Sequence, residues 1–157
     1  MHVKNTFDNL IFTDSEILIL GSLPSVKSRE ENFYYMNKYN RFWKVLSILY
    51  HDDFENSNIE KKKMLLRKYK IALYDVVLEC DIEKSKDDTI TNIVPTNIQE
   101  LIKNTNIKRI FLNGKTAEKI FLKYNSTDIP HYSLPSTSSA NARMSLEELV
   151  LRWEIII

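Results

Sequence analysis

The chain has 157 residues, a formal net charge of +1 and 43% hydrophobic residues. This length predicts one domain, residues 1–157, which buries roughly 70% of the surface that its unfolded form exposes. Cys80 is the only cysteine, which excludes an intramolecular disulfide and a cysteine-held iron–sulfur cluster. The near-neutral charge neither requires nor excludes nucleic acid, because local clusters of basic residues matter more than their sum.

The amino-terminal segment and the histidines set further expectations. Residues 1–4 lack the apolar core of a signal peptide, and no apolar run reaches the ~20 residues of a membrane span. We therefore expect a cytoplasmic protein that does not enter the membrane. His2, His51 and His131 lie far apart in sequence, without the spacing of metal ligands. We expect no metal and no cofactor.

The spacing of apolar residues alternates between the period of a strand and that of a helix. In chain order it predicts a strand over Ile17–Leu20, helices over Arg41–Tyr50 and Ile59–Tyr69, a strand over Ile71–Val77 bounded by the polar stretch Cys80–Asp88, a helix over Asn97–Lys103, a strand over Ile107–Leu112, a helix over Thr116–Lys123, a strand over Ile129–Leu134 and a closing helix over Ser145–Glu154. Short strands separated by helices indicate an α/β fold with a small four-stranded parallel sheet covered on both faces.

Local signals add detail to three of these helices. Asn40 is a candidate N-cap for the first helix, and Ser145 with Glu148 predicts a capping box at the last one. In the second helix we expect residues 64–66, Met-Leu-Leu, to face inward. The lysine run 61–63 is expected to form its solvated face.

The two glycines of the chain, Gly21 and Gly114, each follow an apolar run directly. In an open α/β sheet the ligand crevice lies outside the carboxyl ends of the strands, where the chain must turn sharply. A plain turn is the alternative for either glycine alone. Because both stand at the same kind of place, we expect the loops Gly21–Ser25 and Asn113–Thr116 to border an active site. The second loop is not a Walker A motif, since Arg109 stands where that motif requires glycine.

The densest chemical signal is the segment Phe33–Trp43, in which six of eleven residues are aromatic. Aromatic rings stack on nucleobases, and the interleaved Lys38 and Arg41 could reach phosphates. Ordinary core packing is the alternative, and spacing alone favours neither. The two aromatic residues that open the following helix are better core candidates. Those freer to face a ligand are Tyr34, Tyr35 and Tyr39.

A loop rich in hydroxyl groups, Leu134–Asn141, follows the fourth predicted strand. Standing alone, it is typical of a connection that supplies helix caps. Its hydroxyl groups could also bind phosphates while the tip of the loop enters a groove of DNA.

Taken in this order, these segments resemble the uracil-DNA glycosylase superfamily, most closely its hypoxanthine-DNA (deoxyinosine) glycosylase family. The resemblance rests on Leu20–Glu30, Phe33–Tyr35, Asn40–Trp43, Ala72–Val76, Asn92–Pro95, Ile110–Gly114 and Leu134–Ser138. It implies a three-layer α/β/α sandwich on the four-stranded parallel sheet. It also implies a monofunctional DNA glycosylase that flips a deaminated base, hypoxanthine first, out of DNA and hydrolyses its N-glycosidic bond by water attack.

The chain departs from the usual pattern of that family at four places, which are Met36–Tyr39, Thr96, Asn97 and Ser139. These departures bear on pocket shape and base preference more than on the fold.

The resemblance also implies roles for individual residues. Asn40 would position the attacking water, Phe33 or Tyr34 would stack on the flipped base, and Asp75 and Asn113 would bind the edge of the base. An equally weighted alternative makes Asp75 a helix or loop cap. The base pocket would also include Gly21, Ser22, Leu23, Pro24 and Ser25. DNA would be held by Lys27, Ser136, Thr137, Ser138, Ser139, Ala140, Asn141 and Arg143, and residues 140–144 would fill the gap that the base leaves.

The expected partner is DNA with a deaminated base, double-stranded or single-stranded, bound by a monomer. Two other functions stay open. One is a mismatch-type uracil or thymine glycosylase, which shares the Asn40–Trp43 segment. The other is a catalytically silent DNA-binding module. Asn40 separates the silent module from the enzymes, because a module that only binds DNA needs no water-positioning amide.

Overall fold

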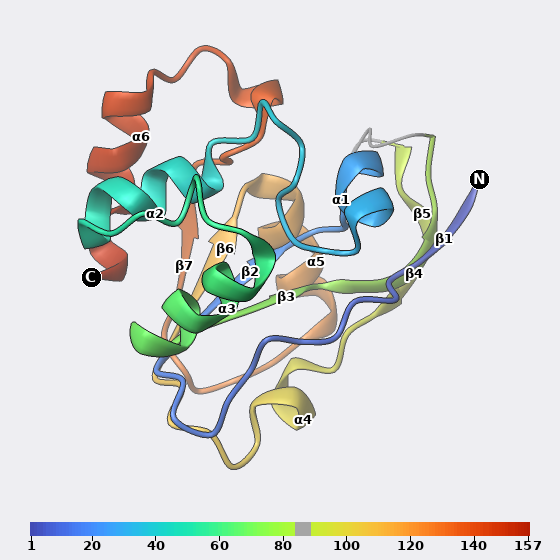
Figure 1. The fold of residues 1–157 in the computed structure, drawn as a ribbon. Coiled ribbons are helices and arrows are strands. Elements are labelled where there is room, and N and C mark those ends of the chain that lie inside the picture. The colour runs from blue at the N-terminus through green and yellow to red at the C-terminus, as the bar shows by residue number, and fades with distance from the viewer. Residues whose placement is uncertain (84–88) are drawn as a thin grey trace.

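The computed structural model describes residues 1–83 and 89–157 (Figure 1). Its centre is a parallel sheet of four strands in the order β3–β2–β6–β7. The strands are β2 (Ile17–Gly21), β3 (Ile71–Asp75), β6 (Arg109–Asn113) and β7 (His131–Leu134). This confirms the α/β class and the four parallel strands that the sequence predicts.

Helices cover both faces of this sheet because the chain moves toward one edge of the sheet from β2 to β3 and toward the other edge from β6 to β7. Helices α2 (Phe42–Tyr50) and α3 (Ile59–Lys68) lie on the connection from β2 to β3, whereas α5 (Lys115–Tyr124) joins β6 to β7 on the other side of β2. Right-handed crossovers in opposite directions place their helices on opposite faces. Helix α6 (Leu146–Trp153) packs against α2, away from α5, so three layers result (Figure 1).

The same topology fixes where a ligand crevice forms. Strands β2 and β6 are neighbours, but the chain leaves them toward opposite faces of the sheet. A crevice opens at such a switch point, outside the carboxyl ends of the two strands. Gly21 ends β2, and Gly114 directly follows β6.

A second sheet, which the sequence analysis does not predict, lies beside the first. It is antiparallel in the order β1–β4–β5, with strands β1 (His2–Lys4), β4 (Val77–Asp81) and β5 (Thr91–Pro95). The predicted strand Ile71–Val77 is therefore wrong at its end. The chain turns after β3, where the Val76 N–H donates to the Gly21 carbonyl, and Val77 begins β4. Of the predicted polar boundary Cys80–Asp88, Cys80 is buried in β4, and residues 84–88 lie outside the described part.

Most helix ends agree with the capping signals. Ser145 accepts a hydrogen bond from the Glu148 N–H and begins α6, and α4 (Ile98–Ile102) begins after its cap Asn97. Helix α1 (Val26–Glu31) is an addition to the predicted set, with Ser25 as its cap. The prediction for Asn40 needs correction. Arg41 occupies the N-cap position of α2, while the Asn40 Oδ1 accepts from the Phe42 N–H. Short 3₁₀ turns complete the chain at Ser139–Asn141 and Glu154–Ile156.

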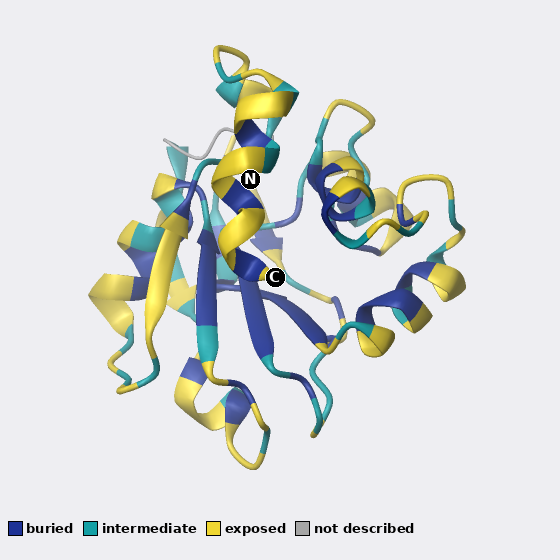
Figure 2. Ribbon diagram, turned by 90° about the vertical axis from the view of Figure 1, so that its left-hand side faces the viewer, coloured by how far each residue is buried: buried dark blue, intermediate teal, exposed yellow. Residues whose placement is uncertain are grey.

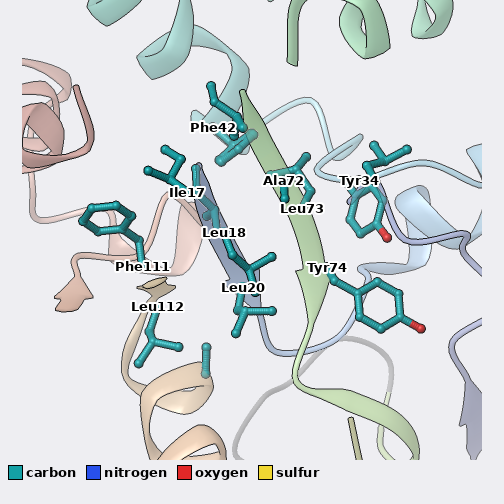
Figure 3. Close-up of a cluster of buried hydrophobic side chains, with 14 of the residues drawn as sticks. Ile17, Leu18, Leu20, Tyr34, Phe42, Ala72, Leu73, Tyr74, Phe111 and Leu112 are labelled. Atoms are coloured by element: carbon teal, nitrogen blue, oxygen red, sulfur yellow. The ribbon is translucent and has the colours of Figure 1, made fainter. Parts of the chain in front are cut away.

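The core lies between the parallel sheet and its helices (Figures 2 and 3). Two predictions for α3 are wrong, because Met64 is 69% exposed and Lys62 only 5%. The buried positions of this helix are Lys62, Leu65 and Leu66, spaced i, i+3 and i+4 along one face. The Lys62 ammonium donates to the Glu55 and Ser57 carbonyls, which compensates its burial. No described helix is long and apolar enough to cross a membrane.

Candidate active site

A cleft of about 1120 Å³ opens at the carboxyl edge of the parallel sheet. Its walls come from the loops after β2, β6 and β7 and from the segment before α2. Most residues that the sequence nominates for base or DNA binding line this cleft. They are Gly21, Ser22, Leu23, Pro24, Ser25, Tyr34, Asn40, Asp75, Asn113, Ser136, Thr137, Ser138, Ser139, Ala140 and Asn141.

Gly21 allows a carboxylate to approach the strand backbone. It pairs with Asp75 in the sheet register. A Cβ atom at Gly21 would lie 2.7 Å from the Asp75 Oδ1 and 3.0 Å from the Tyr35 hydroxyl oxygen, so any side chain there would displace these groups. The other carboxylate oxygen, Oδ2, accepts a hydrogen bond of 3.1 Å from the Asn5 side chain. Because a strand follows Asp75 after one residue, the alternative role of Asp75 as a helix cap is wrong, whereas its role as a loop cap stays a prediction.

Asn113 is held in one orientation by two hydrogen bonds with Thr137. Its Oδ1 accepts from the Thr137 N–H at 3.0 Å, and its Nδ2 donates to the Thr137 hydroxyl at 3.0 Å. The second Nδ2–H takes part in neither of these bonds, so a ligand can accept from it in competition with the Tyr35 hydroxyl, which the Asn113 side chain also approaches. Thr137 is fully buried, so the prediction that its hydroxyl binds a phosphate is wrong. It anchors the loop instead.

Asp75 and Asn113 lie on either side of Gly21 at the sheet edge. Gly21 pairs with Asp75, and Asn113 follows Leu112, the partner of Leu20. Two strand spacings separate the backbones of Asp75 and Asn113, about 10 Å. Since the strand between them ends in glycine, that strand puts no side chain into this gap, and the Tyr35 hydroxyl lies beside Gly21 instead.

The aromatic segment divides between core and cleft. Phe33 is only 3% exposed and stacks on Trp43, with ring centroids 5.8 Å apart, so its assignment to the base pocket is wrong. Tyr34 lines the cleft but is buried, and its hydroxyl donates to the Asp8 carbonyl at 2.8 Å. Tyr39 is largely exposed and lies outside the lining. Core packing therefore accounts for most of this segment.

Tyr35 lines the cleft, in agreement with its prediction as an aromatic residue free to face a ligand, although the sequence analysis does not include it in the base pocket. Its ring stacks on Phe42 with centroids 4.0 Å apart, and its backbone has a left-handed φ of 54°. Among the described residues its buried hydroxyl makes no hydrogen bond of good geometry, although the Asn113 amide approaches it. Burial, and then the Asp75 charge, raise the pKa of the Tyr35 phenol, while the Asn113 side chain acts in the opposite direction. The hydroxyl therefore stays protonated and can donate to a ligand.

Asn40 lines the cleft, and its amide is held in place. Its Oδ1 accepts from the Phe42 N–H at 2.9 Å, and its backbone N–H donates to the Asn37 carbonyl at 2.9 Å. A carbonyl oxygen has two lone pairs, so the contact with the helix leaves one for a water molecule. The hydrogen bond with the Phe42 N–H and the positioning of a water are therefore compatible at this residue.

The positive charges near the cleft differ from the predicted ones. Lys27 and Arg143 are not part of its lining, and the Lys27 ammonium is 2.9 Å from the Glu31 carboxylate. Lys115 and Arg152 line the cleft and are exposed. The position of Lys115 directly after Gly114 was a usable signal, whereas Arg152 lies in a helix that no motif marked. Within residues 1–83 and 89–157, no three His, Cys, Asp or Glu side chains are grouped as metal ligands.

The fold and the cleft place the chain in a known class of DNA repair proteins. Residues 9–156 match the family model of the Uracil DNA glycosylase superfamily, and the chain belongs to that superfamily. This confirms the resemblance seen in the sequence.

Individual relatives narrow the comparison. Two of them are named hypoxanthine DNA glycosylase. The one from Methanosarcina acetivorans is 30% identical over 157 residues, 98% of each chain, and the one from Methanosarcina barkeri is 30% identical over 152 residues, 96% of this chain and 95% of the relative. A solution NMR structure of a candidate uracil DNA glycosylase from Methanosarcina acetivorans superimposes with a TM-score of 0.86 at 30% identity. The match covers 99% of this chain and 96% of that one.

Proposed function

We propose that this protein is a monofunctional DNA glycosylase that hydrolyses the N-glycosidic bond of a deaminated base, with hypoxanthine as the preferred one. Membership of the superfamily supports the reaction, and the names of the two Methanosarcina relatives support the base. The observation that carries the proposal is the placement of Asp75 and Asn113 on either side of Gly21, in a cleft that Asn40 also lines. The protein would act as a monomer in the cytoplasm, without a cofactor.

The reaction requires access to a bond that a stacked duplex hides. The enzyme flips the nucleotide into the cleft, at a cost of a few kcal/mol that is smaller for a mispaired base. Water then adds to C1′ of the deoxyribose as the base leaves with the bonding electrons. The Asn40 amide would orient this water, and the phosphates of the DNA would stabilise the cationic sugar. Fixed donors in the cleft would stabilise the negative charge on the departing base.

Hypoxanthine presents a donor and an acceptor side by side, N1–H and O6. The Asp75 carboxylate would accept from N1–H, and the remaining N–H of Asn113 would donate to O6. Adenine reverses this pattern, with an acceptor at N1 and an amino group at C6, so both contacts become repulsive. Uracil repeats the N–H and C=O pair of hypoxanthine. The test must therefore include both deaminated bases.

The experiment incubates the protein with DNA that contains deoxyinosine, deoxyuridine or neither, and then cleaves abasic sites with alkali. We expect cleavage at deoxyinosine, unchanged in excess chelator, because the described residues contain no metal-ligand group. Cleavage at deoxyuridine alone would identify the mismatch-type enzyme. Binding without any cleavage would identify a silent module. Loss of activity in chelator, restored by a divalent ion, would contradict the metal-free reaction.

A further inference from the structure

Arg41 joins the segment that carries Asn40 to the loop after β7, which also lines the cleft. Its Nη1 donates to the Met144 carbonyl at 2.6 Å, and its Nη2 donates to the Asn141 carbonyl at 3.1 Å. The Arg41 backbone N–H donates to the Thr137 carbonyl at 3.0 Å. One residue thus holds three carbonyl groups spread over eight positions of that loop. Among the described residues, no carboxylate forms a salt bridge with this guanidinium.

The loop in question, residues 136–144, is here called the wedge loop. Apart from one 3₁₀ turn it has no regular structure, so side chains must hold it in place. Asn113 anchors its first part through Thr137, and Asn141 donates back to the Ser136 carbonyl at 3.0 Å. Its tip is exposed at Ser139 and Ala140. The Arg41 guanidinium is the link that joins the second part of the loop to the segment before α2.

We propose that Arg41 is a positioning residue that fixes the wedge loop against the segment before α2, so that the tip of the loop meets the duplex as a rigid element, while Asn40 keeps its own position through the Phe42 N–H. The inference rests on the proposed function. Arg41 itself would not touch the flipped base. A side chain that wedges into a duplex must resist the restacking of the bases, whereas a single strand leaves no gap to fill. The contribution of Arg41 should therefore appear on duplex DNA and largely vanish on single-stranded DNA.

The test replaces Arg41 with lysine, which keeps the charge but cannot donate to two carbonyls in a planar fork. Arg109 provides a matched control. Its guanidinium also donates to two backbone carbonyls, those of Ile155 at 2.7 Å and Ile156 at 3.1 Å, but it lies outside the cleft lining. Single-turnover release of hypoxanthine is measured on one sequence as a duplex and as a single strand, for wild type, Arg41→Lys and Arg109→Lys.

We expect Arg41→Lys to lower the duplex rate by about 10-fold or more, because small displacements of a positioned group are costly, and to change the single-strand rate by less than about 3-fold. Arg109→Lys should keep the wild-type ratio of the two rates. A 2-aminopurine next to the deoxyinosine should show weaker base extrusion with Arg41→Lys than with wild type.

An unchanged ratio of the duplex rate to the single-strand rate, or an equal loss on both substrates, would overturn the inference. If wild type releases no base from either substrate, the proposed function itself fails. The melting temperature identifies a variant that does not fold, and the ratio still reports on its folded fraction.

Discussion

The two sheets of the protein differ in burial and in what their strands contribute to the cleft. In the parallel sheet, β2 and β3 are buried at all five positions. In the antiparallel sheet, β5 exposes three of its five residues. Gly21, Asp75 and Asn113 all come from carboxyl ends of parallel strands, whereas among the described residues no member of β1, β4 or β5 lines the cleft.

This difference indicates that the parallel sheet carries the cleft residues, whereas the antiparallel sheet stabilises the structure around them. Burial on both faces makes β2, β3 and the middle of β6 rigid, whereas the edge strand β7 exposes three of its four residues. The shared direction of β2, β3 and β6 brings three ends to one edge, where small errors in position are costly. The antiparallel sheet contributes indirectly, since Asn5, directly after β1, donates to the Asp75 carboxylate. Substitutions at the cleft edge should therefore change turnover. Substitutions in the antiparallel sheet should change stability alone.

The largest effect is expected for Asn40→Ala. Loss of the amide removes an interaction that acts mainly in the transition state, so kcat should fall by ~100-fold or more while DNA affinity stays near wild type. The hydrogen bond to the Phe42 N–H is lost as well, which should cost about 0.5–2 kcal/mol of stability. Single-turnover release from deoxyinosine and the melting temperature measure the two effects.

Ser145→Ala is the matched control for Asn40→Ala. It removes a side-chain acceptor from the start of α6, at an exposed residue outside the cleft lining. A similar loss of stability with normal turnover is expected. If Asn40→Ala is destabilised but keeps the wild-type single-turnover rate, its catalytic assignment is wrong and Asn40 serves only to accept the Phe42 N–H.

The next largest effect is expected for Gly21→Ala. The new methyl group would push against the Asp75 carboxylate and the Tyr35 hydroxyl, so kcat/KM should fall by about 10-fold or more. Overpacking should also cost about 1–3 kcal/mol of stability. Gly114→Ala differs in mechanism, because its φ of 98° strains any other residue, and its Cβ would lie 3.1 Å from the Ser136 Cβ. Equal activity of Gly21→Ala and wild type would show that catalysis does not depend on the present position of the Asp75 carboxylate.

The parallel sheet was predictable because its physical signal is local. Strands buried on both faces are continuous apolar runs, and β2 is such a run. The antiparallel sheet gave no such signal. Its strands mix buried and polar positions, β1 has only three residues, and its register depends on pairing across more than seventy positions of sequence. No short window contains that information.

The site was predictable to a similar degree. Gly21 and Gly114 marked the correct edge, because the carboxyl ends of parallel strands must meet there. Phe33 and Tyr35 show the limit, since both are aromatic and lie two residues apart, yet one is in the core and the other in the cleft. The left-handed backbone at Tyr35 reverses the local chain direction, and spacing rules assume that no such reversal occurs. The hydrogen bonds of the Arg41 guanidinium were not predictable either, because they join it to carbonyls about a hundred residues away in the sequence.

A smaller effect is expected for the positive charges. Lys115→Ala should weaken binding to all duplexes alike and reduce the slope of log K against log salt by about 1, because a phosphate contact carries no sequence information. Lys27→Ala should change the slope less, since Glu31 already neutralises the Lys27 ammonium. Fluorescence anisotropy at several salt concentrations measures both slopes. A larger change for Lys27→Ala, or an effect confined to one lesion, would contradict this assignment of charges.

The smallest effect is expected for His2→Gln, in the antiparallel sheet. The His2 ring is hydrogen-bonded to Asp81 at 3.1 Å and to Glu79 at 3.0 Å, and these bonds, Asp81 first, raise the pKa of the imidazole above its ordinary 6.5. Because the raised pKa belongs to the folded state, the stabilisation is fully present below the ordinary pKa and is lost as pH rises through the raised one. The melting temperature of His2→Gln should therefore be lower than that of wild type at about pH 5.5 and equal to it at about pH 8.5.

Turnover at either pH should be unchanged by the His2→Gln substitution, since His2 lies outside the cleft lining. A stability difference that grows with pH would contradict the ion pairing, and a change in kcat would show that the antiparallel sheet affects the chemistry directly.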